Sequence, residues 1–320
     1  MQTAPVSLDQ AHRLANAIVD NVGQVILGKR TVIEEAVITM LAEGHLLLED
    51  VPGTGKTMLA RSLAASIDGT SQRVQATPDL LPTDITGVSI FDQQTQEFRF
   101  HPGPVFANLV LVDEINRASP KTQAALLEVM EEAQVTVDGQ TYAAPRPFMV
   151  VATQNPVEMD GTYPLPEAQL DRFLMLTSVG APSREIEVQI LRNRSDGHGA
   201  DMLSPVATVA DVQSMIDSAR QVYLSDALLG YVADLAGSLR ARDDLSLAVS
   251  PRGSLALVRA VRAKAVLEGR EYGSADDVKA LIVPVWRHRL ILTHEARVAR
   301  MSAGNIIGAV VQTTPVPAER

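Results

Sequence analysis

A glycine turn between an apolar run and a helical start is the first stretch of this 320-residue sequence whose residue types could do chemistry. It reads LLLEDVPGTGKTML, residues 46–59. Gly53 and Gly55 would let the backbone turn with its amides pointing inward, which makes an anion site at a helix N-terminus. Lys56 would reach the β- and γ-phosphates of a nucleotide, and Thr57 would hold Mg²⁺ through its hydroxyl group.

The match to the phosphate-loop pattern is incomplete. The pattern is Gly-x4-Gly-Lys-Ser/Thr, and Asp50 occupies its first glycine position. Taken alone, the stretch therefore also fits an ordinary strand–turn–helix connection.

A second candidate is the acidic pair Asp113 and Glu114, which follows the apolar run 109–112. A carboxylate that ends a buried strand can lie beside the Mg²⁺ held by Thr57, and the adjacent Glu can polarise the attacking water. Many strands end in solvated acids, so the pair alone is weak evidence. Together, the two motifs predict hydrolysis of a nucleoside triphosphate.

Three further polar residues could complete such a site. Asn155 follows another apolar run, where its amide could bind the γ-phosphate and the water, although an Asn-Pro pair also starts turns. Arg172 fits either a surface ion pair with Asp171 or an arginine finger supplied to a neighbouring subunit. Arg252 could reach a phosphate across a domain cleft, or it could cap a solvated helix end.

The scaffold that positions these side chains is expected to be an α/β domain with a parallel sheet. Short apolar runs typical of buried strands alternate along the chain with segments of helical periodicity. We expect strands at about 45–51, 109–114, 148–156 and 171–179, and helices at about 7–21, 57–66 and 119–134. Residues 25–45 predict a turn and a further helix that ends near Gly44. Two further segments are expected to form protruding β-hairpins. Residues 87–104 alternate with a period of two around a polar centre, and residues 134–145 have Asp138-Gly139 between two β-type runs. After Pro182 the pattern is helical. We therefore expect a core at 1–181 and a helical domain at 182–320, with a flexible tail from about 312.

Composition narrows the function classes. The chain has no cysteine, which excludes disulfides, a Cys-ligated metal site and a thiol nucleophile. Its net charge of −10 disfavours extensive contact with nucleic acid. No apolar run approaches the roughly 20 residues of a membrane-spanning helix, and the N-terminus does not resemble a signal peptide. We expect a cytoplasmic protein without membrane insertion.

Four blocks closely resemble the MoxR family of AAA+ ATPases. They are EDVPGTGKT, LVLVDEINRASPKTQAALLEVMEE, VVATQNPVEMDGTYPLPEAQLDRF and SPRGSL, and the resemblance runs from about Val25 to about Leu290. It implies an AAA+ P-loop core with hairpin insertions and a C-terminal helical lid. In this family the first glycine of the loop is not required.

The resemblance also implies roles for individual residues. Lys56 and Thr57 correspond to Walker A, Asp113 and Glu114 to Walker B, Asn155 to sensor 1, Arg172 to the arginine finger and Arg252 to sensor 2. Thr57 and Asp113 would hold Mg²⁺. The residues expected to contact ATP are Val25, Ile26, Gly28, Pro52, Gly53, Thr54, Gly55, Lys56, Thr57, Met58 and Asp113.

Family membership would further imply a homo-oligomeric ring, typically a hexamer, that matures enzyme complexes or inserts metal cofactors beside a von Willebrand factor A domain protein. Two alternatives stay open. A nucleic-acid motor is disfavoured because FDQQTQEF and TVDGQTY carry no Lys or Arg. A metal-chelatase motor subunit would require a chelatase partner.

Overall fold

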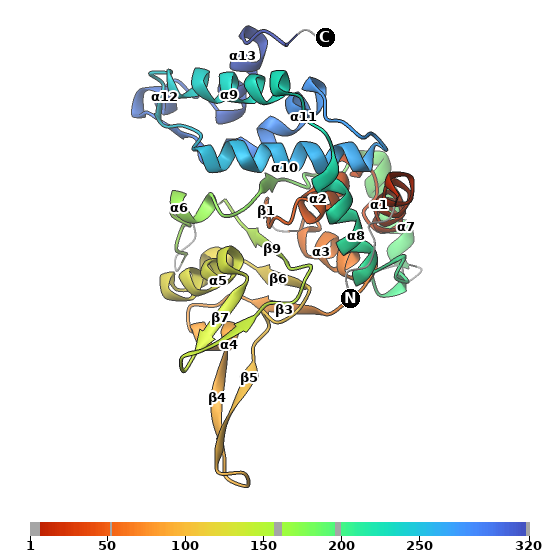
Figure 1. Ribbon diagram of the computed structural model, residues 1–320, viewed down its shortest axis with the longest axis vertical. Coiled ribbons are helices and arrows are strands. Elements are labelled where there is room, and N and C mark those ends of the chain that lie inside the picture. Colours follow the sequence, from red (N-terminus) through yellow and green to blue (C-terminus); the bar gives the residue numbers. More distant parts are fainter. Residues whose placement is uncertain (1–6, 52, 157–161, 196–199, 318–320) are drawn as a thin grey trace.

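The computed structural model describes residues 7–51, 53–156, 162–195 and 200–317 (Figure 1). Its centre is a five-stranded sheet in the order β10-β1-β9-β6-β3, and every ladder in it is parallel. The strands are β1 (Leu46–Glu49), β3 (Ser71–Gln75), β6 (Leu109–Asp113), β9 (Met149–Gln154) and β10 (Met175–Thr177). The expected parallel sheet is confirmed.

Two strands differ from the sequence prediction. The strand expected at 171–179 is only Met175–Thr177, because α6 (Glu167–Leu170) and a non-strand segment precede it. The edge strand β3 was not predicted. Only Val74 of its five residues is buried, so it has no apolar run by which it could be recognised.

Alternate residues of the strands face two separate cores. Leu46 and Leu48 belong to one apolar cluster, whereas Leu47 belongs to the other. The first cluster takes in α1 (Leu8–Gly23), α2 (Arg30–Leu41) and α3 (Lys56–Ala65), and the second takes in α5 (Pro120–Glu132). The continuous apolar runs of the sequence follow from this burial on both faces.

The two predicted hairpins are present. The first consists of β4 (Gly87–Asp92) and β5 (Glu97–Pro102), follows α4 (Pro82–Thr86), and projects far from the body in Figure 1. The second consists of β7 (Gln134–Val137) and β8 (Gln140–Ala143). Phe100 of the first stacks on Tyr142 of the second, with ring centroids 4.1 Å apart, so the bases of the hairpins are coupled.

The chain after residue 182 is mainly helical, as expected. Its helices are α7 (Arg184–Ser195), α8 (Val209–Gln221), α9 (Asp226–Arg240), α10 (Pro251–Leu267), α11 (Ala275–Trp286), α12 (His294–Val298) and α13 (Ala303–Thr313). Short elements complete the described chain: β2 (Ile67–Asp68) with β11 (Ala207–Thr208), β12 (Leu245–Leu247) with β13 (Ile291–Leu292), and the 3₁₀ turns 115–117, 200–202 and 287–289. Gln312 and Thr313 belong to α13, so the helix extends into the predicted tail.

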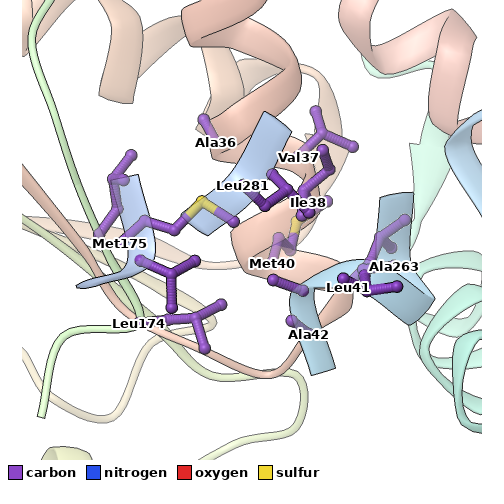
Figure 2. Packing of buried hydrophobic residues seen from close by; sticks show 14 of the residues in the cluster. Ala36, Val37, Ile38, Met40, Leu41, Ala42, Leu174, Met175, Ala263 and Leu281 are labelled. Carbon is purple, nitrogen blue, oxygen red and sulfur yellow. The ribbon is translucent and has the colours of Figure 1, made fainter. Parts of the chain in front are cut away.

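The helical part packs directly on one side of the sheet. Figure 2 shows Met40 and Leu41 of α2 close to Met175 of β10, Ala263 of α10 and Leu281 of α11. All five belong to one buried cluster that includes residues from both sides of position 182. The apolar core alone therefore does not separate two domains, and the boundary at 181/182 stays a prediction.

Candidate nucleotide site

The glycine turn connects β1 to α3 at the carboxyl edge of the sheet. Gly53 and Gly55 have φ angles of 86° and 95°, a region that residues with a side chain rarely adopt. Gly55 is the N-cap of α3, and Lys56 is the first residue of that helix. The turn therefore presents the N-terminus of a helix to an anion. Pro52 lies outside the described residues.

The structure gives a reason for the missing first glycine. The carboxylate of Asp50 accepts hydrogen bonds from the backbone amide of Gly180 (2.5 Å), the hydroxyl of Ser178 (3.0 Å) and the amide of Val51 (2.9 Å). Burial alone would raise the pKa of Asp50, but these hydrogen bonds outweigh it, and the pKa lies below its ordinary value. Asp50 thus ties the turn to the segment that follows β10.

Lys56 folds back over the turn. Its Nζ donates to the carbonyl oxygens of Val51 (3.3 Å), Gln154 (3.2 Å) and Asp50. Burial lowers the pKa of Lys56, and nearby carboxylates, Asp50 foremost, oppose that shift. The ammonium is thereby held between the glycine turn and the end of β9.

Asp113, the last residue of β6, accepts hydrogen bonds from hydroxyl groups and from one arginine. The Thr57 hydroxyl donates to its Oδ1 at 2.9 Å, and Arg73 Nε donates to its Oδ2 at 2.8 Å. Asp113 is buried, and Thr153 also donates to it. A hydroxyl and a carboxylate side by side are the hard oxygen ligands that Mg²⁺ prefers. Among the described residues, no group of three His, Asp or Glu side chains could hold a metal ion by itself.

Glu114 has a left-handed backbone, with a φ of 57°. Such strain in a residue other than glycine is typical of functional sites. Its amide donates to the Thr153 hydroxyl at 3.0 Å, and its carboxylate accepts from Arg117 (3.0 Å) and Gln75 (3.3 Å). These contacts hold the carboxylate beside the glycine turn.

The acidic pair, the turn and Asn155 share one cavity of about 400 Å³. It is lined by Gly53, Gly55, Lys56, Thr57, Met58, Arg61, Arg73, Gln75, Asp113, Glu114, Thr153 and Asn155. Of the sequence candidates, the structure thus brings together the Lys-Thr pair, the Asp-Glu pair and Asn155. Arg73, Gln75, Arg117 and Thr153 were not predicted.

A second, more apolar cavity of about 340 Å³ shares Gly53, Gly55 and Met58 with the first. Its lining includes Val25, Ile26 and Thr54, which are among the residues expected to contact ATP, together with Gln24, Leu27, Lys29, Val179, Gly180, Pro182, Glu187, Ile190 and Leu191. Gly28 does not line it. A Cβ atom there would lie 2.9 Å from Ile186 Cγ1, so Gly28 allows α7 to approach closely. The two joined cavities fit a polar phosphate tail and a flat apolar base.

Arg172 and Arg252 lie elsewhere. Arg172 precedes β10 at the amino edge of the parallel sheet, whereas Lys56 and Glu114 lie at the carboxyl edge. Both arginines line a third cavity of about 220 Å³ that shares no residue with the other two. The structure therefore does not bring Arg252 to the phosphate turn of its own chain, as a reach across the domain cleft would require.

One carboxylate joins these two arginines. Glu131, near the end of α5, forms an ion pair with Arg172 Nη2 at 3.0 Å and accepts a hydrogen bond from Arg252 Nη1 at 2.9 Å. Arg252 also lies 3.8 Å from Asp171, whose other oxygen accepts from the buried Arg289 at 2.6 Å. Sequence patterns gave no signal for Glu131 or Arg289, because their partners are distant in the chain.

Comparisons with known proteins agree with this geometry. The family described as "ATPase family associated with various cellular activities (AAA)" matches residues 45–175, and an AAA lid domain matches residues 237–309. The Chaperone MoxR1 of Mycobacterium tuberculosis is 40% identical over 96% of this chain and 83% of its own length. The Protein MoxR of Paracoccus denitrificans is 36% identical over 92% and 94%.

Two further relatives cover nearly the whole chain. The uncharacterized protein YeaC of Bacillus subtilis is 45% identical over 98% of both chains. A crystal structure of a protein from Cytophaga hutchinsonii, assigned as an ATPase, superposes with a TM-score of 0.88 at 35% identity and covers 97% of this chain and 98% of that one. In the described part of the chain, no helix is both long and apolar enough to cross a membrane.

Proposed function

The chain belongs to the MoxR family of AAA+ ATPases, and from this premise we propose that it hydrolyses ATP with Mg²⁺ in a homo-oligomeric ring, typically a hexamer, to remodel or mature protein complexes. The observation that carries the proposal is the single cavity in which Lys56, Thr57, Asp113 and Glu114 meet. It combines a cation, two candidate metal ligands and a carboxylate at the N-terminus of a helix.

Five side chains of this cavity have a proposed role. Lys56 and the amides of the turn bind the phosphates, and Thr57 and Asp113 hold the metal. Mg²⁺, when bound, would offset charge on the β- and γ-phosphates. Glu114 orients the attacking water, and Asn155 fixes its position relative to the γ-phosphate. The contact between Thr153 and the Glu114 amide supports this arrangement.

We further propose that Arg172 and Arg252 act on the nucleotide of the neighbouring subunit. Both lie at the sheet edge opposite the phosphate turn and line a cavity of their own. Arginines delivered across an interface stabilise charge on the transferring phosphoryl group. Hydrolysis would then require assembly, and loss of the γ-phosphate would release the contacts between neighbours.

The remodelling activity of the ring is proposed from the names of the similar proteins. The Mycobacterium tuberculosis protein carries the name of a chaperone. A von Willebrand factor A domain partner, an enzyme-complex client and metal-cofactor insertion stay predictions, as do the cytoplasmic location and a core at 1–181 with a lid at 182–320. The β4–β5 and β7–β8 hairpins are the proposed levers on a client, and the projecting β4–β5 hairpin exposes Phe91 and Phe98.

An ATP-trapped pull-down tests the proposal. Glu114→Gln subunits with Mg²⁺-ATP should retain partners from the native cell, whereas Lys56→Ala subunits, which cannot bind the nucleotide, should not. ATP-dependent recovery of a von Willebrand A protein with an enzyme complex supports remodelling. Recovery of nucleic acid with replication proteins, or of a chelatase with porphyrin-dependent turnover, would instead support one of the two alternatives.

A further inference from the structure

Glu131 forms ion pairs with two arginines that come from different parts of the fold. Arg172 precedes the last strand of the sheet, and Arg252 is the second residue of α10 in the helical part. Their side chains approach the two different oxygens of the same carboxylate, at 3.0 and 2.9 Å. Without that carboxylate, two guanidinium groups would face each other and repel.

Helix energetics do not explain Arg252 at this position. A cation in the first turn of a helix opposes the helix dipole, which disfavours it. The N-terminus of α10 is already capped by Ser250 and begins with Pro251. Two acidic residues of the α/β core, Glu131 and Asp171, instead offset the unfavourable interaction of the Arg252 charge with the helix dipole.

Two buried side chains, His45 and Arg289, hold the backbone next to Glu131 and Arg172 by hydrogen bonds. His45 is buried, its Nε2 donates to the Met130 carbonyl at 3.0 Å, and its Nδ1 accepts from the Val150 amide at 2.9 Å. The last turn of α5 is thereby fixed to β9. Arg289, also buried, donates to the carbonyls of Asp171 (3.1 Å) and Phe173 (2.7 Å), which fixes the backbone on both sides of Arg172.

We propose that Glu131 is a positioning residue that holds Arg172 and Arg252 at the spacing needed to contact the nucleotide of the neighbouring subunit. This inference rests on the proposed action of the two arginines across the interface. A guanidinium has five N–H donors in a planar fork, so each arginine can keep its contact to Glu131 and still donate to a phosphate. Glu131 itself does not touch the nucleotide.

The kinetic consequence is a selective loss of turnover. We expect Glu131→Ala to lower kcat by about tenfold, because the ion pairs that orient the two arginines are lost. The KM for ATP should stay within about twofold, because the binding cavity of each subunit is untouched. Glu131→Gln, which keeps one acceptor oxygen, should fall between. Glu132→Ala is the matched control, since Glu132 is the next residue of α5 and is exposed.

Mixed rings decide whether Glu131 acts through the arginines. Glu114→Gln subunits have intact arginines but hydrolyse poorly, so adding them to Glu131→Ala subunits should restore turnover. Double-variant subunits, Glu114→Gln with Glu131→Ala, should not. A Glu131→Ala protein with normal kcat would overturn the inference, as would failure of rescue while Arg172→Ala subunits are rescued in parallel. If neither is rescued, the proposed action across the interface is itself wrong.

Discussion

The two edges of the central sheet differ in how their functional groups are assembled. At the carboxyl edge, Lys56 and Thr57 follow β1, Asp113 and Glu114 end β6 or directly follow it, and Asn155 follows β9. Parallel strands bring these ends together, so short motifs are sufficient. At the amino edge, the cluster depends on contacts between positions 131, 172 and 252, which no short motif encodes. The carboxyl edge is proposed to bind the nucleotide of its own subunit, and the amino edge is proposed to act on the nucleotide of a neighbour.

The division between the edges is tested most strongly by Arg172→Ala. If the amino edge acts in trans, the variant should bind ATP normally yet lose about 1000-fold in turnover, as arginine-finger losses do. Adding Glu114→Gln subunits should partly restore hydrolysis, measured as phosphate release at fixed Arg172→Ala concentration. A mixture that stays inactive at every ratio would place the role of Arg172 within its own subunit.

Glu114→Gln tests the carboxyl edge. The amide keeps the size of the side chain but cannot accept a proton or polarise water as a carboxylate does. We expect kcat to fall by about 100-fold or more, with ATP affinity retained. Gln75→Ala is an informative companion, because it removes one of the hydrogen bonds to Glu114 and should cost much less. Normal turnover in Glu114→Gln would remove this residue from the proposed mechanism.

The sequence predicts the carboxyl edge well because each of its motifs begins where an apolar run ends. It predicts the parallel sheet, both hairpins and the helical second half, since apolar periodicity reports burial directly. It did not locate β3, whose residues are mostly exposed, and therefore missed Arg73 beside Asp113. Glu131 was missed because α5 is an ordinary amphipathic helix whose exposed acids look alike until the fold supplies their partners.

The amino edge should be the more acid-sensitive part of the fold. Burial lowers the pKa of His45 to about 4, from 6.5. Between these values the unfolded chain binds a proton that the folded chain does not, so the contribution of His45 to the free energy of unfolding should fall as the pH decreases, by about 1.4 kcal/mol per pH unit. The stabilisation is complete above pH 6.5 and lost towards pH 4.

Denaturant titrations at several pH values measure this slope. His45→Gln does not titrate, and its amide can donate or accept a hydrogen bond at this position, so its slope between pH 6.5 and 4 should be shallower than that of the wild type. The slope is compared, not the absolute stability, because the substitution itself has a cost. His101→Gln, on the exposed β4–β5 hairpin, is the control and should leave the slope unchanged. Equal slopes in His45→Gln and the wild type would mean that His45 does not stay neutral in the folded protein.

The smallest expected effect concerns Arg73, which brings a cation to the same carboxylate that is proposed to hold Mg²⁺. The Arg73 side chain is 56% exposed, so its ion pair with Asp113 contributes about 1 kcal/mol at most. Removing a competing cation should make the metal bind more tightly. Arg73→Ala should therefore lower the Mg²⁺ concentration that half-saturates binding of a fluorescent ATP analogue, by up to about fivefold. Arg61→Ala removes a positive charge from the same cavity wall and controls for the change in local charge. A rise in the half-saturating concentration would contradict competition and indicate that Arg73 assists nucleotide binding in its own subunit, whereas Arg172 and Arg252 are proposed to act on the nucleotide of the next subunit.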